Sequence, residues 1–112
     1  MAARPPAILV VLVTCPNRAS ARRIGEQVIA RRAAACVNIV PGVLSLFWWQ
    51  GRIERAPEVL LIMKTTAAGF ERLRRTVLSL HPYTVPEIIA VRVVAAHLPY
   101  HQWVGKNVQA RS

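Results

Sequence analysis

Two strand-length stretches joined by a tight turn constrain the fold of this chain more than any other feature. They span residues 35–49 and 52–65, and both are rich in β-branched, aliphatic and aromatic side chains. Gln50-Gly51 supplies the turn between them, so we predict a long antiparallel hairpin. Pro41-Gly42 interrupts the first strand. Because proline cannot donate to a ladder and glycine permits a bulge, we expect one bent strand there.

An uninterrupted apolar run over residues 7–14 predicts a central strand that is buried on both faces. Cys15-Pro16-Asn17 ends this run, which puts Cys15 in a loop, and Asn17 is a suitable cap for a helix. From residue 19 to about residue 32, apolar residues recur at helical spacing. Gly25 lies inside that predicted helix and costs it roughly 1 kcal/mol relative to alanine.

A second helix, a strand and a short third helix complete the predicted elements. Thr66 is a suitable cap for a helix over residues 67–80, whose apolar side chains form one stripe. Residues 87–94 read as a strand, and residues 99–107 as a short helix with Trp103 on its inner side.

The order β-α-β-β-α-β followed by a short helix is that of the ferredoxin-like fold. This is an α+β fold in which two helices cover one face of a four-stranded antiparallel sheet. For a chain of 112 residues we expect one domain, 1–112, with an ordered core over about residues 7–107. The fold hosts many unrelated functions, so function has to be argued from particular residues.

The formal net charge of +10 raises nucleic acid as a possible partner. Most of the arginines fall on the two predicted helices, where a charged outer face is ordinary, so we favour a solvated surface. Phe47-Trp48-Trp49 alternates between the faces of a strand, and the first strand contains no aromatic residue. This arrangement argues against an RNA-binding sheet. The apolar fraction of 54% leads us instead to expect an oligomer.

Cys15 and Cys36 are too few for a disulfide framework and form no CxxC motif. We therefore expect a reduced, cytoplasmic protein. No stretch is long enough to span a bilayer, so we expect no membrane partner.

Residues 80–89 display an imidazole, a phenol and a carboxylate within ten positions. His81 ends the second predicted helix, where it is either a capping residue or a metal ligand facing a cleft. Glu87 borders an apolar strand, and a carboxylate there is costly to desolvate unless it is paired. An extended chain would separate these two side chains by up to ~20 Å, so other strands or another subunit have to complete a shared site. With Cys36 as a third ligand, such a site would suit zinc or copper.

Lys64 interrupts an apolar strand end, where it would pair with Glu87 or bind an anion. His97 and His101 are four residues apart, but Pro99 lies between them, so we expect two solvent-exposed histidines. The chain contains no Gly-rich phosphate loop, HExxH, GxSxG or Ser/His/Asp arrangement, so an enzyme is not favoured.

Four strings follow one another along the chain: AACVNIVPG at 34–42, FWWQG at 47–51, EVLLIMKT at 58–65 and HPYTVPEI at 81–88. In order and spacing they closely resemble the CutA, or divalent-cation tolerance, family. The resemblance runs from about residue 8 to residue 103.

The resemblance implies a tight homotrimer in which the bent hairpin joins sheets between subunits. It implies a role in tolerance to divalent metals, copper especially, with Cu(II) or another divalent ion as the ligand. We expect no organic cofactor, and the sequence does not identify a protein partner. The positions it places along the cleft between subunits are Cys36, Trp49, Lys64, His81, Tyr83, Glu87 and Trp103.

This chain departs from the family pattern at Asn17-Arg18 and Gln50-Gly51-Arg52, where relatives commonly carry acidic residues. Fewer carboxylates reduce the attraction for cations at the surface. We expect weak metal binding by His81 and Glu87, with Cys36 as a third ligand. Two alternatives stay open: a PII-like trimeric signalling module that binds a small anion, and a purely structural or adaptor trimer.

Overall fold

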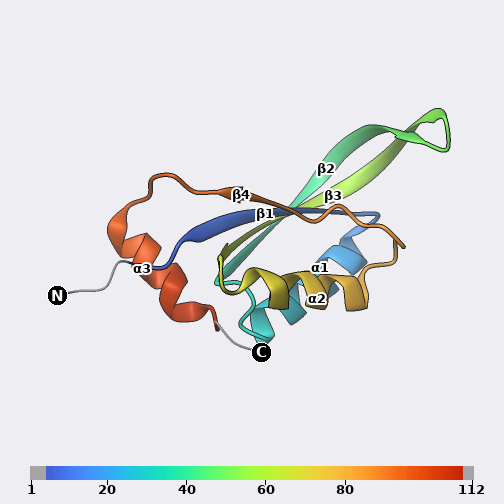
Figure 1. Cartoon of the computed structure of the whole chain (residues 1–112). Coiled ribbons are helices and arrows are strands. Elements are labelled where there is room, and N and C mark those ends of the chain that lie inside the picture. The colour runs from blue at the N-terminus through green and yellow to red at the C-terminus, as the bar shows by residue number, and fades with distance from the viewer. Residues whose placement is uncertain (1–4, 110–112) are drawn as a thin grey trace.

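The elements of the computed structural model, which describes residues 5–109, follow the predicted order. They are β1 (Ile8–Cys15), α1 (Arg18–Ala30), β2 (Cys36–Trp49), β3 (Arg52–Thr66), α2 (Phe70–Leu80), β4 (Ile89–Arg92) and α3 (Leu98–Asn107). The architecture is α+β, with a four-stranded antiparallel sheet and three helices (Figure 1). None of these helices is both long and apolar enough to cross a membrane.

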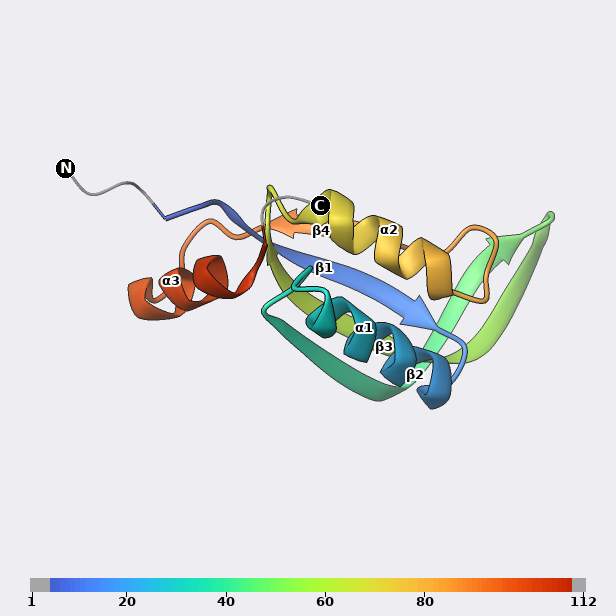
Figure 2. The ribbon, with the colours of Figure 1, turned by 90° about the horizontal axis from the view of Figure 1, so that it is seen from below.

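The strand order is β2-β3-β1-β4, so β1 lies inside the sheet and pairs with both β3 and β4. α1 and α2 lie side by side on one face of this sheet (Figure 2). The core lies between these two layers, where apolar side chains of β1 and β3 meet one stripe of each helix. Its fully buried members include Val11, Val13, Ile24, Val28, Leu61, Met63, Leu73 and Val77.

Helix α1 begins as predicted, because the Asn17 side chain accepts a hydrogen bond from the Ser20 amide at 2.8 Å. Gly25 has a packing reason: a Cβ at this position would lie 3.2 Å from Cγ1 of Val37. The glycine therefore lets α1 lie close against β2.

The predicted bent hairpin is confirmed. The pairing of β2 with β3 shifts register between Val40 and Val43, and Gly42 there has φ +82°, a conformation that glycine adopts without strain. β1 pairs with residues 59–66 of β3. The outer part of the hairpin, residues 43–58, therefore projects from the sheet (Figure 1).

The face of the sheet opposite the helices is largely aliphatic. Leu12, Ile62 and Ile89 stand in register across three strands, and beside them Val10 pairs with Val91 of β4 and with Lys64 of β3. Ile89 is 51% exposed and Val91 is 53% exposed. An antiparallel sheet with one solvated face normally carries polar residues there, so this face has the composition of a contact surface.

Several predicted boundaries were wrong. Cys15 is not in a loop but is the last residue of β1 and fully buried. α2 begins at Phe70 rather than residue 67, because the Thr66 hydroxyl accepts from the amide of Gly69 and holds a turn ahead of the helix. β4 is confined to four residues, Ile89–Arg92, instead of 87–94.

The C-terminal helix also differs from expectation. Trp103 is 44% exposed rather than on the inner side, and Val104 and Val108 supply the buried contact with Ile8. His97 is the N-cap of α3 and is exposed, as expected. His101 is half-buried instead, and its Nε2 donates to the Pro6 carbonyl at 2.6 Å.

Candidate functional site

Two polar clusters, one at the middle of β3 and one near its C-terminal end, contain four of the predicted site residues. We call the first the His81 cluster (Thr14, Cys15, Glu58, His81 and Tyr83) and the second the Lys64 cluster (Cys36, Asn38, Lys64 and Tyr100). Glu58 and Lys64 are six residues apart on one strand, which is roughly 20 Å at the rise of a β-strand. A single chain therefore does not bring Cys36 together with His81.

His81 caps the C-terminal end of α2 and is almost entirely buried. Its Nε2 lies 2.8 Å from the carbonyl oxygen of Thr14, and its Nδ1 accepts a hydrogen bond from the Tyr83 amide at 3.0 Å. Because a carbonyl only accepts, Nε2 must carry the proton, which makes the ring the neutral Nε2–H tautomer. Both ring nitrogens are engaged, so a metal can bind His81 only by displacing one of these partners.

Glu58 is the site residue that the sequence analysis missed. This carboxylate is buried, at 7% exposure, and its Oε2 accepts a hydrogen bond of 2.9 Å from the Tyr83 hydroxyl. The argument that a carboxylate beside an apolar strand needs a partner was sound, but it applies to Glu58, which directly precedes a run of five apolar residues. Glu87 is exposed.

The surroundings of Glu58 shift the pKa values of two neighbouring groups. Burial, and then the nearby Glu58 carboxylate, raise the pKa of the Cys15 thiol to about 11. Partial burial, and then the hydrogen bond to Glu58, raise the pKa of Tyr83 to about 12. Both groups are therefore neutral near pH 7, and Cys15 offers a thiol rather than the thiolate that metals prefer.

The Lys64 cluster surrounds the other cysteine. Nζ of Lys64 donates to Oδ1 of Asn38 and lies 3.9 Å from Sγ of Cys36. Burial, and then the proximity of Cys36, raise the pKa of Tyr100 on α3. No ion pair joins Lys64 to Glu87 within residues 5–109, so the predicted pairing of these two is wrong for one chain.

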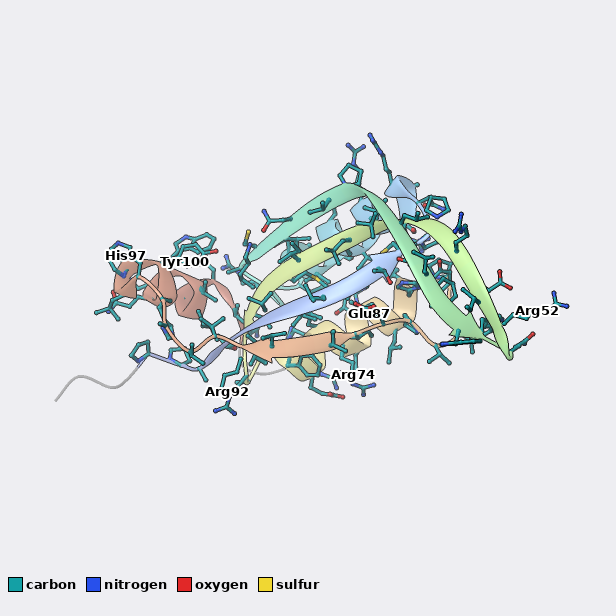
Figure 3. The ribbon with its side chains drawn as sticks, turned by 90° about the horizontal axis from the view of Figure 1, so that it is seen from above. Arg52, Arg74, Glu87, Arg92, His97 and Tyr100 are labelled. Carbon is teal, nitrogen blue, oxygen red and sulfur yellow. The ribbon has the colours of Figure 1, made fainter. Side chains whose placement is uncertain are left out.

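The remaining predicted cleft residues are exposed and far apart. Trp49 ends β2 at the tip of the hairpin and Trp103 lies on α3, which packs at the other end of the molecule (Figure 1). Trp103 contacts the ring of Tyr100, with centroids 5.6 Å apart. Figure 3 shows Glu87 beside the sheet, well separated from both the hairpin tip marked by Arg52 and the helix marked by Tyr100.

The described residues of one chain do not form a metal centre. Between residues 5 and 109 no group of three or more His, Cys, Asp or Glu side chains is placed to hold an ion. The predicted set of His81, Glu87 and Cys36 is therefore a site only if a second chain contributes to it.

Comparisons with known proteins agree on one family. The family described as CutA1 divalent ion tolerance protein matches residues 9–107. The divalent-cation tolerance protein CutA of Thermus thermophilus is 45% identical over 98 residues, which cover 88% of this chain and 95% of that protein. A rice relative named chloroplastic Protein CutA 1 is 41% identical over 90% of this chain, which spans only 57% of that longer protein.

A solved structure of the Thermus thermophilus divalent cation tolerance protein superposes with a TM-score of 0.90 at 43% identity. The superposition covers 91% of this chain and 99% of that chain. The fold therefore extends over nearly the whole length of both chains.

Proposed function

Because the chain belongs to the CutA1 divalent ion tolerance family, we propose that it is a homotrimer that binds copper or another divalent ion at clefts between its subunits. The protein would bind and release the ion without catalysing a reaction, and one domain would suffice for this. The observation that carries the proposal is the aliphatic face of the sheet that the helices leave uncovered.

That face supports assembly from copies of the same chain. Ile89, Val91 and Val40 are exposed there by 51%, 53% and 37%. Burying such side chains contributes about 25 cal/mol per Å² of apolar surface removed from water. A symmetric assembly of identical chains covers the face of every subunit with the same contact.

The hairpin supports the same conclusion. β2 lies at the edge of the sheet and is 14 residues long, and edges of this length are templates for pairing with another chain. Beyond the bend the hairpin exposes Leu44, Leu46, Trp48 and Ile53 by 58%, 59%, 72% and 66%. We infer that this arm lies against neighbouring subunits and brings Trp49 toward residues of another chain.

We propose His81, Glu87 and Cys36 as the metal ligands, with Trp49, Lys64, Tyr83 and Trp103 along the cleft. The contacts within one chain bear on how strong the binding would be. His81 would exchange the Tyr83 amide for the ion at Nδ1, and the Lys64 ammonium 3.9 Å from the Cys36 sulfur opposes a cation there. Both effects favour weak binding, as suits a protein that senses or buffers an ion rather than storing it.

Two other roles keep specific support. A small anion would bind the Lys64 ammonium in place of Asn38, as in a PII-like signalling module. A structural or adaptor trimer needs only the aliphatic face. We propose a cytoplasmic location, although the rice relative is named as chloroplastic. Nucleic acid is the least favoured partner.

Two measurements test this proposal. Sedimentation velocity at several concentrations gives the oligomeric state, and a stable monomer would remove the inter-subunit cleft and every assignment made to it. Calorimetric titration with Cu(II) then compares the wild type with His81→Ala, and equal binding by both excludes His81 as a ligand. Raised melting temperatures with anions but not with metals would favour the signalling alternative.

A further inference from the structure

Lys64 places a positive charge in the aliphatic face of the sheet. Met63, the residue before it, is fully buried in the core under the helices, so the side chain of Lys64 points to the opposite face. There it stands level with Val10 of β1 and Val91 of β4. Its ammonium donates to Asn38 and pairs with no carboxylate among the described residues of the chain.

Glu87 places a negative charge at the other end of the same face. Ile88 packs against the core, so the side chains of Glu87 and Ile89 on either side of it point away from the core. Glu87 is exposed, and Figure 3 shows it beside the sheet. It precedes Val91, the residue level with Lys64, by four positions, which is roughly 13 Å along a strand. The two charges of one chain are therefore too far apart to meet.

The other glutamates are less suited to pair with Lys64. Three of them are engaged within the chain by an arginine or a tyrosine: Glu26, Glu58 and Glu71. Glu54 lies in the hairpin arm with arginines close on both sides of it, at positions 52 and 55. Glu87 is thus the carboxylate best placed to meet an ammonium from another copy of the chain.

An assembly that covers the aliphatic face removes both of these charges from water. A buried charge without a partner opposes assembly, whereas a matched pair offsets much of that cost and fixes how the two surfaces meet. This face carries a positive group towards one end, a negative group towards the other and aliphatic side chains between them. It is therefore complementary to a second copy of itself.

We propose that the Lys64 ammonium of one subunit pairs with the Glu87 carboxylate of a neighbouring subunit and sets the register in which their aliphatic faces meet. The pair rests on the trimer proposed above but not on metal binding. Cys36 lies opposite Lys64 on β2, so the same contact carries Cys36 toward the neighbour's Glu87. A divalent ion that binds Glu87 has to displace the ammonium, which is a further reason for weak binding.

Sedimentation equilibrium of the full chain tests the pair through a double-mutant cycle. Lys64→Met and Glu87→Gln each remove one charge with little change in side-chain size. Each single variant should raise the concentration at which half of the trimer dissociates by about tenfold or more, because it leaves one charge buried alone. The double variant should raise this concentration by no more than the worse single variant does, because no unpaired charge remains.

Two matched controls remove charges that lie elsewhere. Arg23 is an exposed arginine on α1, and Glu54 is an exposed glutamate of the hairpin arm. Arg23→Gln and Glu54→Gln should each change the half-dissociation concentration by less than about twofold. Circular dichroism confirms that each variant is folded, and Lys64→Gln takes the place of Lys64→Met in the cycle if the latter is not.

The opposite results are equally clear. Strictly additive effects of Lys64→Met and Glu87→Gln would overturn the pair. A weakening by Lys64→Met that Glu87→Gln does not share would also overturn it, as would coupling of Lys64 with Glu54 instead. A wild type that stays monomeric would overturn the proposed trimer together with the pair, whereas additive variants of a stable trimer would overturn the pair alone.

Discussion

The hydroxyl of Tyr83 donates a 2.9 Å hydrogen bond to the carboxylate of Glu58, and this bond ties the loop after α2 to the middle of β3. Glu58 is buried, so the bond compensates the desolvation of a charge. Through the Tyr83 amide the same loop also fixes Nδ1 of His81. The position of His81 therefore depends on a carboxylate that lies 23 residues earlier in the chain.

Removing the hydroxyl should destabilise the protein. We expect Tyr83→Phe to lower the free energy of unfolding by about 1–3 kcal/mol, because Glu58 is left as a buried charge without its donor. Denaturant unfolding at fixed protein concentration measures this. The double variant Tyr83→Phe, Glu58→Gln should lose less than the sum of the two single changes, and strict additivity would contradict the coupling.

Alkaline pH should destabilise the protein through Cys15. Its pKa rises from an ordinary 9.0 to about 11 in the folded state. The folded state therefore keeps the thiol proton up to a higher pH than the unfolded chain does. The contribution of the protonated thiol to the free energy of unfolding is complete below pH 9 and is lost as pH rises through 11. We expect a loss of up to about 2 kcal/mol over this window.

The matched comparison for this pH dependence is between Cys15→Ala and Cys36→Ala. Urea unfolding from pH 8 to pH 11 should give a flatter pH profile for Cys15→Ala than for Cys36→Ala. Two parallel profiles would contradict the assignment to Cys15.

The tautomer of His81 can be observed directly. Long-range ¹H–¹⁵N spectra near pH 7 should show the proton on Nε2 and a bare Nδ1, since Thr14 accepts and the Tyr83 amide donates. Added Zn(II), a diamagnetic divalent ion, should then shift the Nδ1 resonance and leave those of His97 unchanged. An Nδ1–H signal would contradict the hydrogen bonds described above.

The aliphatic sheet face should control assembly. We expect Ile89→Glu to dissociate the proposed trimer, because it places a charge in the contact surface. Ile29→Glu is the matched control, since Ile29 is 42% exposed on the helical side of the molecule. Sedimentation velocity checks both variants, and a trimer unaffected by Ile89→Glu would move the interface elsewhere.

Periodicity and turn chemistry were enough to predict the hairpin, its bend and the cap at Asn17, because these depend on residues close together in the sequence. Cys15 and Trp103 were misplaced for a different reason. Whether the last residue of a strand is buried, or which side of a short helix faces inward, depends on what packs there from elsewhere. In this chain Val104 takes the inner position of α3 and packs with Ile8, a contact between the two ends of the sequence.

The site was harder to predict than the fold. Glu58 and Glu87 both adjoin apolar strands, and the sequence does not reveal which of the two accepts a hydrogen bond from the Tyr83 phenol. Glu58 accepts a hydrogen bond from Tyr83 because the loop after α2 returns to β3. Lys64 lies near Cys36 because the register of the hairpin places these two residues opposite each other, and its ammonium group also donates to Asn38.

The outer half of the hairpin has a consequence for folding kinetics. In this outer half, residues 43–49 of β2 and 52–58 of β3 pair only with each other among the described residues, because β1 ends at Cys15, opposite Val59. A two-stranded ribbon is barely stable alone in water. In the proposed trimer we therefore expect the ribbon to become ordered late, in a bimolecular step whose rate rises with protein concentration. The rest of each chain would fold earlier, at a rate independent of protein concentration.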